Sequence, residues 1–343
     1  MGNLAFEFET DAATSLVAII IPTLNEELHI WSTLNALARQ SLGCCREIIV
    51  VDGGSTDATC TLVRQYAELD DRVRLIHNAN RLQSSGINLA VSQIDPDTRY
   101  FIRADAHSVY PDNFVEKLLS AAVTSGAQSV VTRLKAEGET CFQRAVSMVS
   151  NSVIGTGGAI HRVGGESRFV DHGHHALFDR HYFATIGGYD ESFATNEDAE
   201  FDVRLCAAGG KIWFSNDSTI TYLPRSTPKA LAMQYFAYGA GRARNLMKHR
   251  NGLRLRQLLP PMTVLLVALC LALSLSSPWF LVVPMIYMAA VGFATLAIYH
   301  KLKARCALAG IIAAPIMHFA WGAGFIAEFV SPIGRAPRRL LSH

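Results

Sequence analysis

The chain has 343 residues, of which 50% are hydrophobic and 17% charged, and its formal net charge is +2. This length allows two folded units, and the near balance of charge predicts no nucleic-acid partner. Seven cysteines, an odd number without a Cys-x-x-Cys pair, argue against a disulfide framework and a zinc ribbon and favour a reducing compartment.

The first part of the chain alternates between strand and helix patterns. Residues 16–21 are a continuous apolar run ended by Pro22, as in a strand buried on both faces of a sheet. The other elements expected here are strands at 47–52, 73–77 and 100–104 and helices at 26–40, from 55 or 56, at 86–91 and at 111–123. This alternation predicts a doubly wound α/β sheet over about the first 130 residues.

From Ser129 the pattern loosens, and several glycines predict a loop-rich region. Further elements expected after it are short helices at 180–186 and 197–207, a strand at 211–214 and a long helix at 227–249.

The C-terminal part has a membrane composition. Residues 258–277 and 279–299 are apolar and close to the roughly 20 residues that a bilayer crossing needs. Residues 306–329 are a third candidate, but positive residues lie on both sides of it, so two crossings or three remain open. A basic group precedes the first crossing, as expected on its cytoplasmic side, and consists of Arg242, Arg244, Lys248, His249, Arg250, Arg254 and Arg256.

Polar residues follow the predicted strands where each strand ends. The carboxyl ends of parallel strands share one edge of the sheet, where such folds bind ligands. Asp105 and His107, just after the fourth strand, could share a divalent cation that takes its remaining ligands from substrate phosphates. Taken alone, this triplet is more often a turn whose aspartate caps the next helix.

Four motifs in fixed order give the site a wider context. They are Ile21-Pro22-Thr23-Leu24-Asn25-Glu26, Val50-Val51-Asp52-Gly53-Gly54-Ser55-Thr56-Asp57, Asp105-Ala106-His107, and Asn196-Glu197-Asp198-x-Glu200-Phe201 followed by Arg204-Leu205. With them the chain resembles the family-2 inverting glycosyltransferases of the GT-A fold over about residues 16–224. The resemblance implies a nucleotide-diphospho-sugar transferase sheet followed by a C-terminal transmembrane helical region.

The same resemblance assigns roles to residues. Thr23, Glu26 and Asp52 are expected to contact the uracil and ribose of a UDP-sugar, and Asp105 with His107 to hold Mg²⁺ or Mn²⁺. The full nucleotide-sugar set that it implies is Pro22, Thr23, Asn25, Glu26, Asp52, Gly54, Ser55, Asp57, Arg81 and Asp105.

The catalytic pair implied by the resemblance is Asp198 with Glu197. Asp198 is expected to be the base, because inversion at an anomeric carbon needs a carboxylate that takes the proton of the acceptor hydroxyl. Glu197 could raise the pKa of Asp198 by like-charge repulsion, or could only cap the helix.

The sequence departs from the family pattern at two positions. Gly53 stands where many relatives have an aspartate, and His107 replaces the second aspartate of Asp-x-Asp, so the metal affinity or preference could differ. With the apolar segments, Asp105-Ala106-His107 is most similar to the bacterial succinoglycan or exopolysaccharide glucosyltransferase branch, whose acceptors are carried on a polyprenyl diphosphate.

The acceptor side is predicted to involve the helix before the membrane. Gln234, Tyr238, Arg242 and Arg244 are assigned to the acceptor diphosphate, although the arginines could equally mark the membrane surface. Residues 234–238 lack the arginine and tryptophan of the Gln-x-x-Arg-Trp motif of processive synthases, which favours the addition of a single sugar. A histidine-rich cluster, interpreted as a polar loop near the acceptor rather than a zinc site, comprises Asp171, His172, His174, His175 and His181.

The sequence therefore predicts a membrane-anchored enzyme that moves a hexose, expected to be glucose, from a UDP-sugar to a lipid-linked saccharide. The expected location is the bacterial inner membrane, with a cytoplasmic catalytic domain. Alternatives are a processive synthase and a non-catalytic nucleotide-sugar sensor. The predicted division is a tail at 1–15, a glycosyltransferase domain at 16–226, a basic connecting helix at 227–257, membrane helices at 258–329 and a basic tail at 330–343.

Overall fold

The computed structural model describes residues 17–41, 43–250 and 255–330. The described chain forms two compact units, one of residues 17–132 and 166–220 and the other of residues 133–165 and 221–330. Residues 133–165 thus belong with the C-terminal helices, although they lie in the middle of the sequence. The expected N-terminal tail, the basic C-terminal tail beyond Val330, and Arg254 of the basic group lie outside the described residues.

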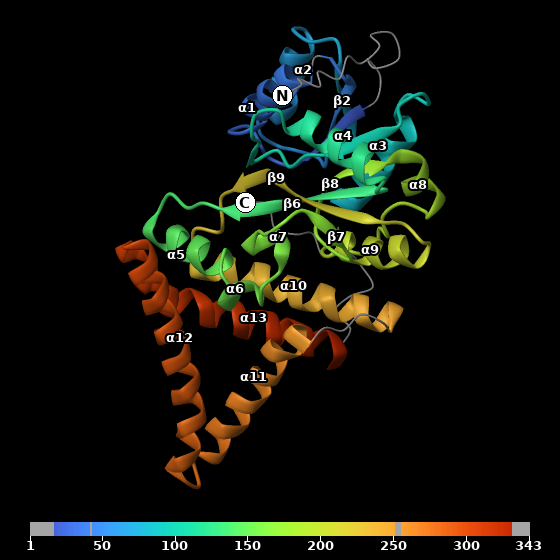
Figure 1. Ribbon diagram of the computed structural model, residues 1–343. Coiled ribbons are helices and arrows are strands. Elements are labelled where there is room, and N and C mark those ends of the chain that lie inside the picture. The colour runs from blue at the N-terminus through green and yellow to red at the C-terminus, as the bar shows by residue number, and fades with distance from the viewer. Residues whose placement is uncertain (1–16, 42, 251–254, 331–343) are drawn as a thin grey trace, which may run out of the picture. The chain divides into compact units, whose positions relative to one another are not determined.

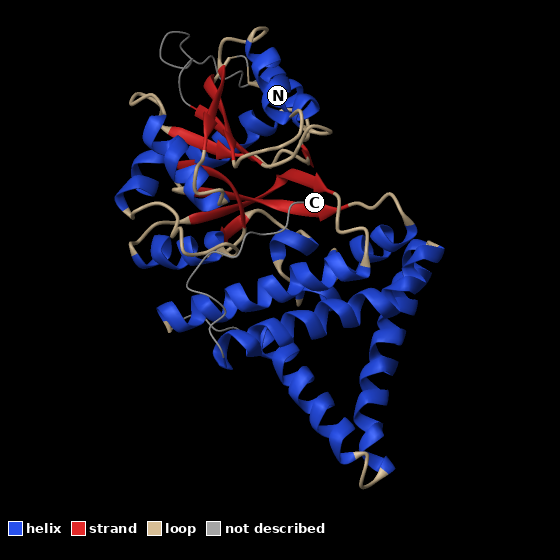
Figure 2. Cartoon of the chain, turned by 180° about the vertical axis from the view of Figure 1, so that it is seen from behind, coloured by secondary structure: helices blue, strands red, loops and turns tan. Residues whose placement is uncertain are grey.

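The first unit is built on the predicted parallel strands. They are β1 (Val17–Thr23), β2 (Cys45–Asp52), β3 (Val73–His77) and β4 (Tyr100–Arg103), in the spatial order β3-β2-β1-β4 and all parallel. Their side chains are mostly buried, as expected of strands covered on both faces. This arrangement confirms the predicted doubly wound sheet (Figure 2).

The helices after β1 and β2 begin later than predicted. Asn25 has a left-handed backbone with φ of 57°, and residues 53–58 make hydrogen bonds across the sheet edge instead of a first helical turn. Neither Ser55 nor Thr56 caps a helix. The helices of this part are α1 (Ile30–Gln40), α2 (Thr59–Ala67), α3 (Gln83–Gln93) and α4 (Phe114–Ser125).

The rest of the sheet is antiparallel and was largely missed by the sequence analysis. The expectation of a loop-rich region from Ser129 is wrong, because β6 (Ser129–Ala136) begins there. β8 (His174–Asp179) lies antiparallel between β4 and β6. The remaining elements are β5 (Ser108–Val109), β7 (Arg168–Val170), β9 (Ile212–Tyr222), α8 (Arg180–Thr185) and α9 (Glu197–Ala207), the two helices close to their predicted bounds.

The second unit is helical. Its helices are α5 (Cys141–Ser150), α6 (Val153–Thr156), α7 (Ile160–Val163), α10 (Pro228–His249), α11 (Leu255–Leu273), α12 (Val282–Leu302) and α13 (Gly310–Val330), with 3₁₀ turns η1 (Pro278–Leu281) and η2 (Arg305–Ala309). Figures 1 and 2 show α10 and α13 side by side and α11 with α12 as a V-shaped hairpin.

Glycines bring α10 and α13 together. A Cβ atom on Gly239 would collide with the carbonyl oxygen of Trp321, and one on Gly324 with that of Phe236. Small residues at both positions therefore let the two backbones approach closely.

Three segments are long and apolar enough to cross a membrane: Arg256–Leu273, Pro278–Leu302 and Arg305–Val330. The hairpin helices leave most of their large side chains exposed. α13 differs, because its polar side chains are bonded: Arg244 lies 3.0 Å from Glu328, and His318 Nε2 lies 2.7 Å from the carbonyl oxygen of Ile154.

A disulfide joins Cys141 of α5 to Cys306 of η2 within this unit, with 5.2 Å between the Cα atoms. The other cysteines, Cys44, Cys45, Cys60, Cys206 and Cys270, are free thiols. The expectation of reduced cysteines is therefore wrong for this pair, whose partners are 165 residues apart and meet only through the packing of α5 against η2.

Candidate active site

The loops after β1 and β2 hold each other at the carboxyl edge of the sheet. The Asn25 amide donates to Ser55 Oγ over 2.9 Å, and the Thr56 amide donates to Asn25 Oδ1 over 2.8 Å. The Glu26 amide donates to Thr59 Oγ1 over 2.8 Å, and the Gly53 amide to the Thr23 carbonyl over 2.8 Å. Predicted nucleotide residues from two separate motifs are thereby brought to one rim.

Asp52 and Asp57 shape this rim by accepting hydrogen bonds. Asp52 accepts from the amides of Gly54 and Ser55 at 2.9 and 3.0 Å. Although burial alone would raise the pKa of Asp52, the hydrogen bonds from Ser55 and Gly54 outweigh it and lower the pKa below its ordinary value. Asp57 accepts from the Thr59 amide and hydroxyl at 3.0 and 2.6 Å, and its pKa is lowered in the same way.

Arg81 lies over the glycines after β2. Gly54 has φ of 92°, and a Cβ atom there would lie 3.3 Å from Arg81 Nε. The side chain of Arg81 therefore rests directly on the Gly54 backbone. Pro22, the remaining predicted nucleotide residue, lies within the carboxyl end of β1.

Asp105 follows β4 and is surrounded by cationic and polar groups. Its carboxylate lies 3.5 Å from His174 Nε2 and 3.9 Å from Arg103 Nε, and it accepts a 3.3 Å hydrogen bond from Gln83. Burial alone would raise the pKa of Asp105, but His174, Arg103 and His107 hold it well below its ordinary value. The carboxylate is ionised, as a metal ligand must be.

His107, the predicted partner of Asp105, makes a different contact. Its Nδ1 lies 2.8 Å from Glu26 Oε1. This bond ties the turn after β4 to the rim after β1, and the imidazole of His174 also lies beside Asp105.

The register of the sheet explains this place of His174. In the antiparallel pair β4 and β8, Tyr100 lies opposite Asp179 and Ile102 opposite Leu177. Continuing the register past the end of β4 brings His174 opposite Asp105. The predicted histidine cluster thus contributes to the site, but only an antiparallel pairing that the sequence analysis did not foresee reveals which histidine.

Arg103 links Asp105 to the fourth motif and was missed by the sequence analysis. This arginine is only 6% exposed, and its Nη1 donates to Glu197 Oε1 over 3.2 Å and to the Tyr189 hydroxyl over 3.3 Å. Burial alone would lower the pKa of Arg103. Its neighbours Tyr189, Glu197 and Asp105 outweigh this effect and raise the pKa well above its ordinary value. A positive charge buried in a predicted strand, two residues before Asp105, was the available signal.

Glu197 and Asp198 open α9 and have different surroundings. Glu197 is buried, whereas Asp198 is half-buried and accepts a 2.7 Å hydrogen bond from the Ala199 amide. Burial raises the pKa of Glu197 to about 7; Arg103 opposes the rise and Asp198 adds to it. The raised pKa that the structure shows in this motif is that of Glu197.

The second face of α9 is fixed by ion pairs. His172 Nδ1 lies 2.6 Å from Asp202 Oδ2. Arg204 lies 2.6 Å from Glu200 Oε2 and donates to the carbonyl oxygens of Ile186 and Gly188. These bonds orient the helix that carries Asp198 and tie it to the glycine turn before it.

The predicted acceptor residues lie on α10 in the second unit. Arg244 forms an ion pair with Glu328, which balances its charge. The ring of Tyr238 lies 5.7 Å from that of Tyr235, and Gln234 and Arg242 are partly exposed.

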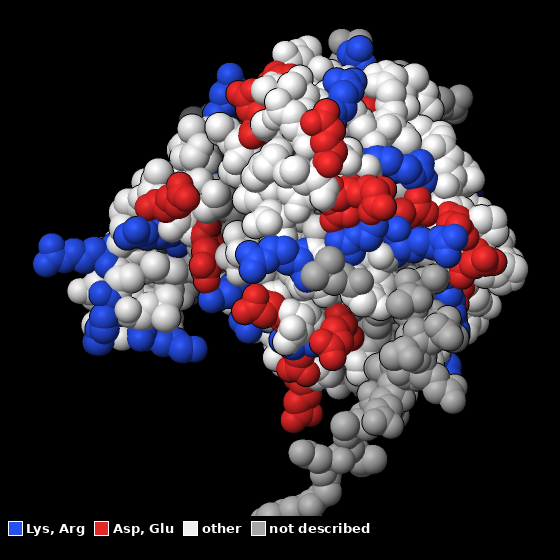
Figure 3. Space-filling view, turned by 90° about the horizontal axis from the view of Figure 1, so that it is seen from above, with Lys and Arg blue, Asp and Glu red and all other residues white. Residues whose placement is uncertain are grey.

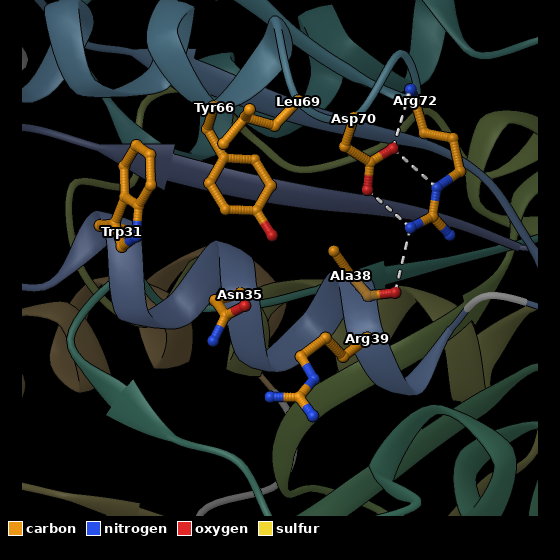
Figure 4. Close-up of a pocket in the computed structure, with 8 residues that line it drawn as sticks. All are labelled: Trp31, Asn35, Ala38, Arg39, Tyr66, Leu69, Asp70 and Arg72. Carbon is orange, nitrogen blue, oxygen red and sulfur yellow. Dashed lines mark hydrogen bonds and ion pairs between the residues drawn. The ribbon is translucent and has the colours of Figure 1, made fainter.

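Two surface features of the first unit bear on the choice of site. A pocket between α1 and α2 is lined by Trp31, Tyr66 and Arg72, with Arg72 held by Asp70 at 2.7 Å (Figure 4). Since Asp70 and Arg72 directly precede β3, this end of the pocket is at the opposite edge of the sheet from Asp105. Another pocket, lined by residues that include His77 and Glu191, lies at the carboxyl end of β3.

Charges of both signs lie side by side on the face that Figure 3 shows.

The chain was compared with known proteins. The family model described as glycosyl transferase family 2 matches residues 18–187. The succinoglycan biosynthesis protein ExoA of Rhizobium meliloti (strain 1021) is 40% identical over 314 residues, which cover 91% of this chain and 94% of that protein. The chain belongs to glycosyltransferase family 2.

More distant proteins agree with this family membership. A glucuronosyltransferase of Methanococcus voltae that is named as acting on a dolichyl-linked N-acetylglucosaminyl phosphate is 23% identical over 72% of the chain and 78% of its own length. A mannosyltransferase from Pyrobaculum calidifontis, solved with GDP-mannose and Mn²⁺, has a TM-score of 0.55 and 18% identity over 96% of this chain and 92% of that one. This structural likeness confirms the GT-A-like fold.

As a family-2 glycosyltransferase, the chain is an enzyme whose motifs meet in one unit. The rim after β1 and β2, the Asp105 turn, and the start of α9 are connected through the bonds of His107 to Glu26 and of Arg103 to Glu197.

Proposed function

We propose that this glycosyltransferase moves a hexose, expected to be glucose, from a UDP-sugar to a saccharide on a polyprenyl diphosphate, with inversion at the anomeric carbon. The product would serve bacterial exopolysaccharide biosynthesis. The single observation that carries the proposal is the contact of Asp105 with buried Arg103, which in turn donates a hydrogen bond to buried Glu197, the neighbour of Asp198 in the sequence. The similarity to ExoA over nearly the whole chain supports the pathway, and the apolar helices support a lipid-linked acceptor.

The reaction assigns separate tasks to the chain's residues. Thr23, Glu26 and Asp52 bind the nucleoside, with Pro22, Asn25, Gly54, Ser55 and Asp57 forming the rim and Arg81 facing the diphosphate. Asp198 accepts the proton of the acceptor hydroxyl as the hydroxyl oxygen forms a bond to C1 of the donor sugar. The bond between C1 and the diphosphate oxygen breaks, and UDP leaves with the bonding electrons. Glu197 holds Arg103, so that its positive charge stays beside Asp105.

The residues also fit a divalent cation, Mg²⁺ or Mn²⁺. Asp105 is ionised, and the 3.5 Å between its carboxylate and His174 Nε2 lets both groups approach one ion. His107 could contribute from the neighbouring position if its bond to Glu26 were exchanged. Such a cation would neutralise the charge that develops on the departing UDP.

The membrane arrangement proposed here has two crossings. The exposed helices α11 and α12 form the hairpin, while α13 packs along α10 and has a carboxylate paired with Arg244. Two crossings leave both ends of the hairpin on one side, so the catalytic unit, α10 and α13 would share the cytoplasmic side of the inner membrane.

Two measurements test the proposal on the full chain in detergent. UDP release from a panel of UDP-sugars, with and without a short-chain polyprenyl-diphosphate saccharide, distinguishes a transferase from a sensor that only binds the nucleotide. The length of the product distinguishes a single addition from processive synthesis. Absence of acceptor-dependent UDP release with every donor would refute the proposal.

A further inference from the structure

A second arginine site lies in the helical unit and is not used by the reaction described above. Arg162 is in the short helix α7, and its Nη1 donates to the Tyr222 hydroxyl over 2.6 Å. The guanidinium carbon also lies 5.1 Å from the centre of the Tyr222 ring. One tyrosine therefore provides both a hydroxyl and a π-face to the same cation.

The partners of Arg162 are neutral. Tyr235 and Tyr238 of α10 are its other electrostatic neighbours. Burial raises the pKa of Tyr235, so its hydroxyl stays protonated and cannot act as a counter-anion. Within the described residues no ion pair joins Arg162 to a carboxylate, in contrast to Arg244, which Glu328 neutralises. Arg162 is half-buried, and a partly buried guanidinium without an anion is costly unless a ligand provides one.

Arg133 approaches the same short helix from β6. Its guanidinium packs on Gly164, where a Cβ atom would lie 2.9 Å from both Cζ and Nε of Arg133, and Gly164 ends α7 two residues after Arg162. Arg133 Nε is buried without a hydrogen-bond partner. Two cationic side chains are thus gathered at α7, one of them with an unused buried donor.

Contacts of the neighbouring segment place α7 close to the start of the membrane hairpin. Arg256, the first residue of the first candidate span, lies 3.4 Å from the carbonyl oxygen of Gly157, between α6 and α7. His318 of α13 bonds the carbonyl oxygen of Ile154 in α6. Residues 154–162 are therefore anchored beside the first residue of a candidate spanning helix, which a membrane crossing would place near the depth of lipid phosphates.

We propose that Arg162 and Arg133, with Tyr222, bind a phosphate group carried on a lipid. Guanidinium groups bind phosphate through paired hydrogen bonds, and the tyrosine hydroxyls offer further donors. The inference rests on the proposed function in one respect: the lipid meant is the prenyl diphosphate that carries the acceptor saccharide. The same chemistry would bind the phosphate of a membrane phospholipid.

The test uses the full chain in an uncharged detergent and farnesyl diphosphate as the probe. Arg162→Gln is expected to weaken its binding on the order of 10- to 100-fold, because each hydrogen bond between charged groups contributes strongly. Arg162→Lys should retain part of the affinity, and Tyr222→Phe should lose a smaller part. Arg144→Gln removes an exposed arginine of the same unit and should change nothing.

Two further readouts decide the source of the phosphate and exclude a purely structural role. UDP binding, measured in each sample, should match wild type in every variant.

Nanodiscs of phosphatidylglycerol are added as a competitor. Competition that depends on Arg162 would show a phospholipid site, and lack of competition would show a diphosphate site. Both results support binding of a lipid phosphate. Unchanged farnesyl diphosphate affinity in Arg162→Gln, or loss of UDP binding in all three variants, would overturn the proposal. Intact, Arg162-dependent binding without sugar transfer would refute only the proposed function.

Discussion

Arg103 and Glu197 are joined by a 3.2 Å hydrogen bond between two buried side chains, one from the strand before Asp105 and the other from the helix that carries Asp198. This bond connects the strand that precedes Asp105 to the start of α9, the two segments on which the proposed chemistry depends.

Asp198→Asn should abolish sugar transfer while UDP still binds. The amide has nearly the same shape but cannot accept the acceptor proton, and loss of a general base costs on the order of 100- to 10,000-fold in rate. Single-turnover transfer and UDP affinity are the measurements. Asp217→Asn, an exposed carboxylate of β9, is the matched control. Turnover near that of wild type in Asp198→Asn would assign the base to another residue.

Removal of divalent metal with a chelator should eliminate transfer, and added Mn²⁺ or Mg²⁺ should restore it. Asp105→Ala should stay inactive at any metal concentration. His174→Ala should need more metal than wild type, because its imidazole lies beside the Asp105 carboxylate. His107→Asp should remain active with an altered preference between the two metals. His181→Ala, an exposed histidine, is the control, and full activity in chelator would contradict the assignment.

Glu197→Gln should change how stability depends on pH. The pKa of Glu197 is raised in the folded chain from an ordinary 4.5 to about 7. Its contribution to the free energy of unfolding is therefore present below pH 4.5 and is lost as the pH rises through about 7. As the pH rises between these two values, the unfolding temperature of Glu197→Gln should fall less than that of wild type. Glu68→Gln, at an exposed position, should follow wild type. Parallel curves for wild type and Glu197→Gln would show an unshifted carboxyl.

Gly239→Ala should destabilise the helical unit by about 1–3 kcal/mol, as overpacking of a tight contact does. The added methyl group would meet the carbonyl oxygen of Trp321, and backbone cannot move aside as a side chain can. Gly292→Ala is the matched control, because a Cβ atom there meets only Ile311 at 3.9 Å. Equal thermal stability of the two variants in detergent would contradict the close packing of α10 and α13.

Local patterns were enough to predict the parallel part of the sheet and the helices at its carboxyl edge. β1 is an apolar run that is buried throughout, and α9 starts at Glu197, as its motif indicates. Membrane helices were equally visible, because composition alone marks them.

The remaining features depend on contacts between residues distant in sequence. Antiparallel β8 places His174 beside Asp105, and no periodicity near either residue reports that register. The bond between His107 and Glu26 also joins residues that are distant in sequence, and so does the disulfide between Cys141 and Cys306. The ion pair of Arg244 with Glu328 likewise needs two helices that the hairpin separates in sequence.

The pairing of α10 with α13 sets an order for biosynthesis. α10 leaves the ribosome before the hairpin, and its glycine-lined face has no partner until α13 has been translated. In the proposed arrangement the hairpin between them is available for insertion into the membrane before α13 is complete. The helical unit can therefore close only after the whole hairpin has been translated.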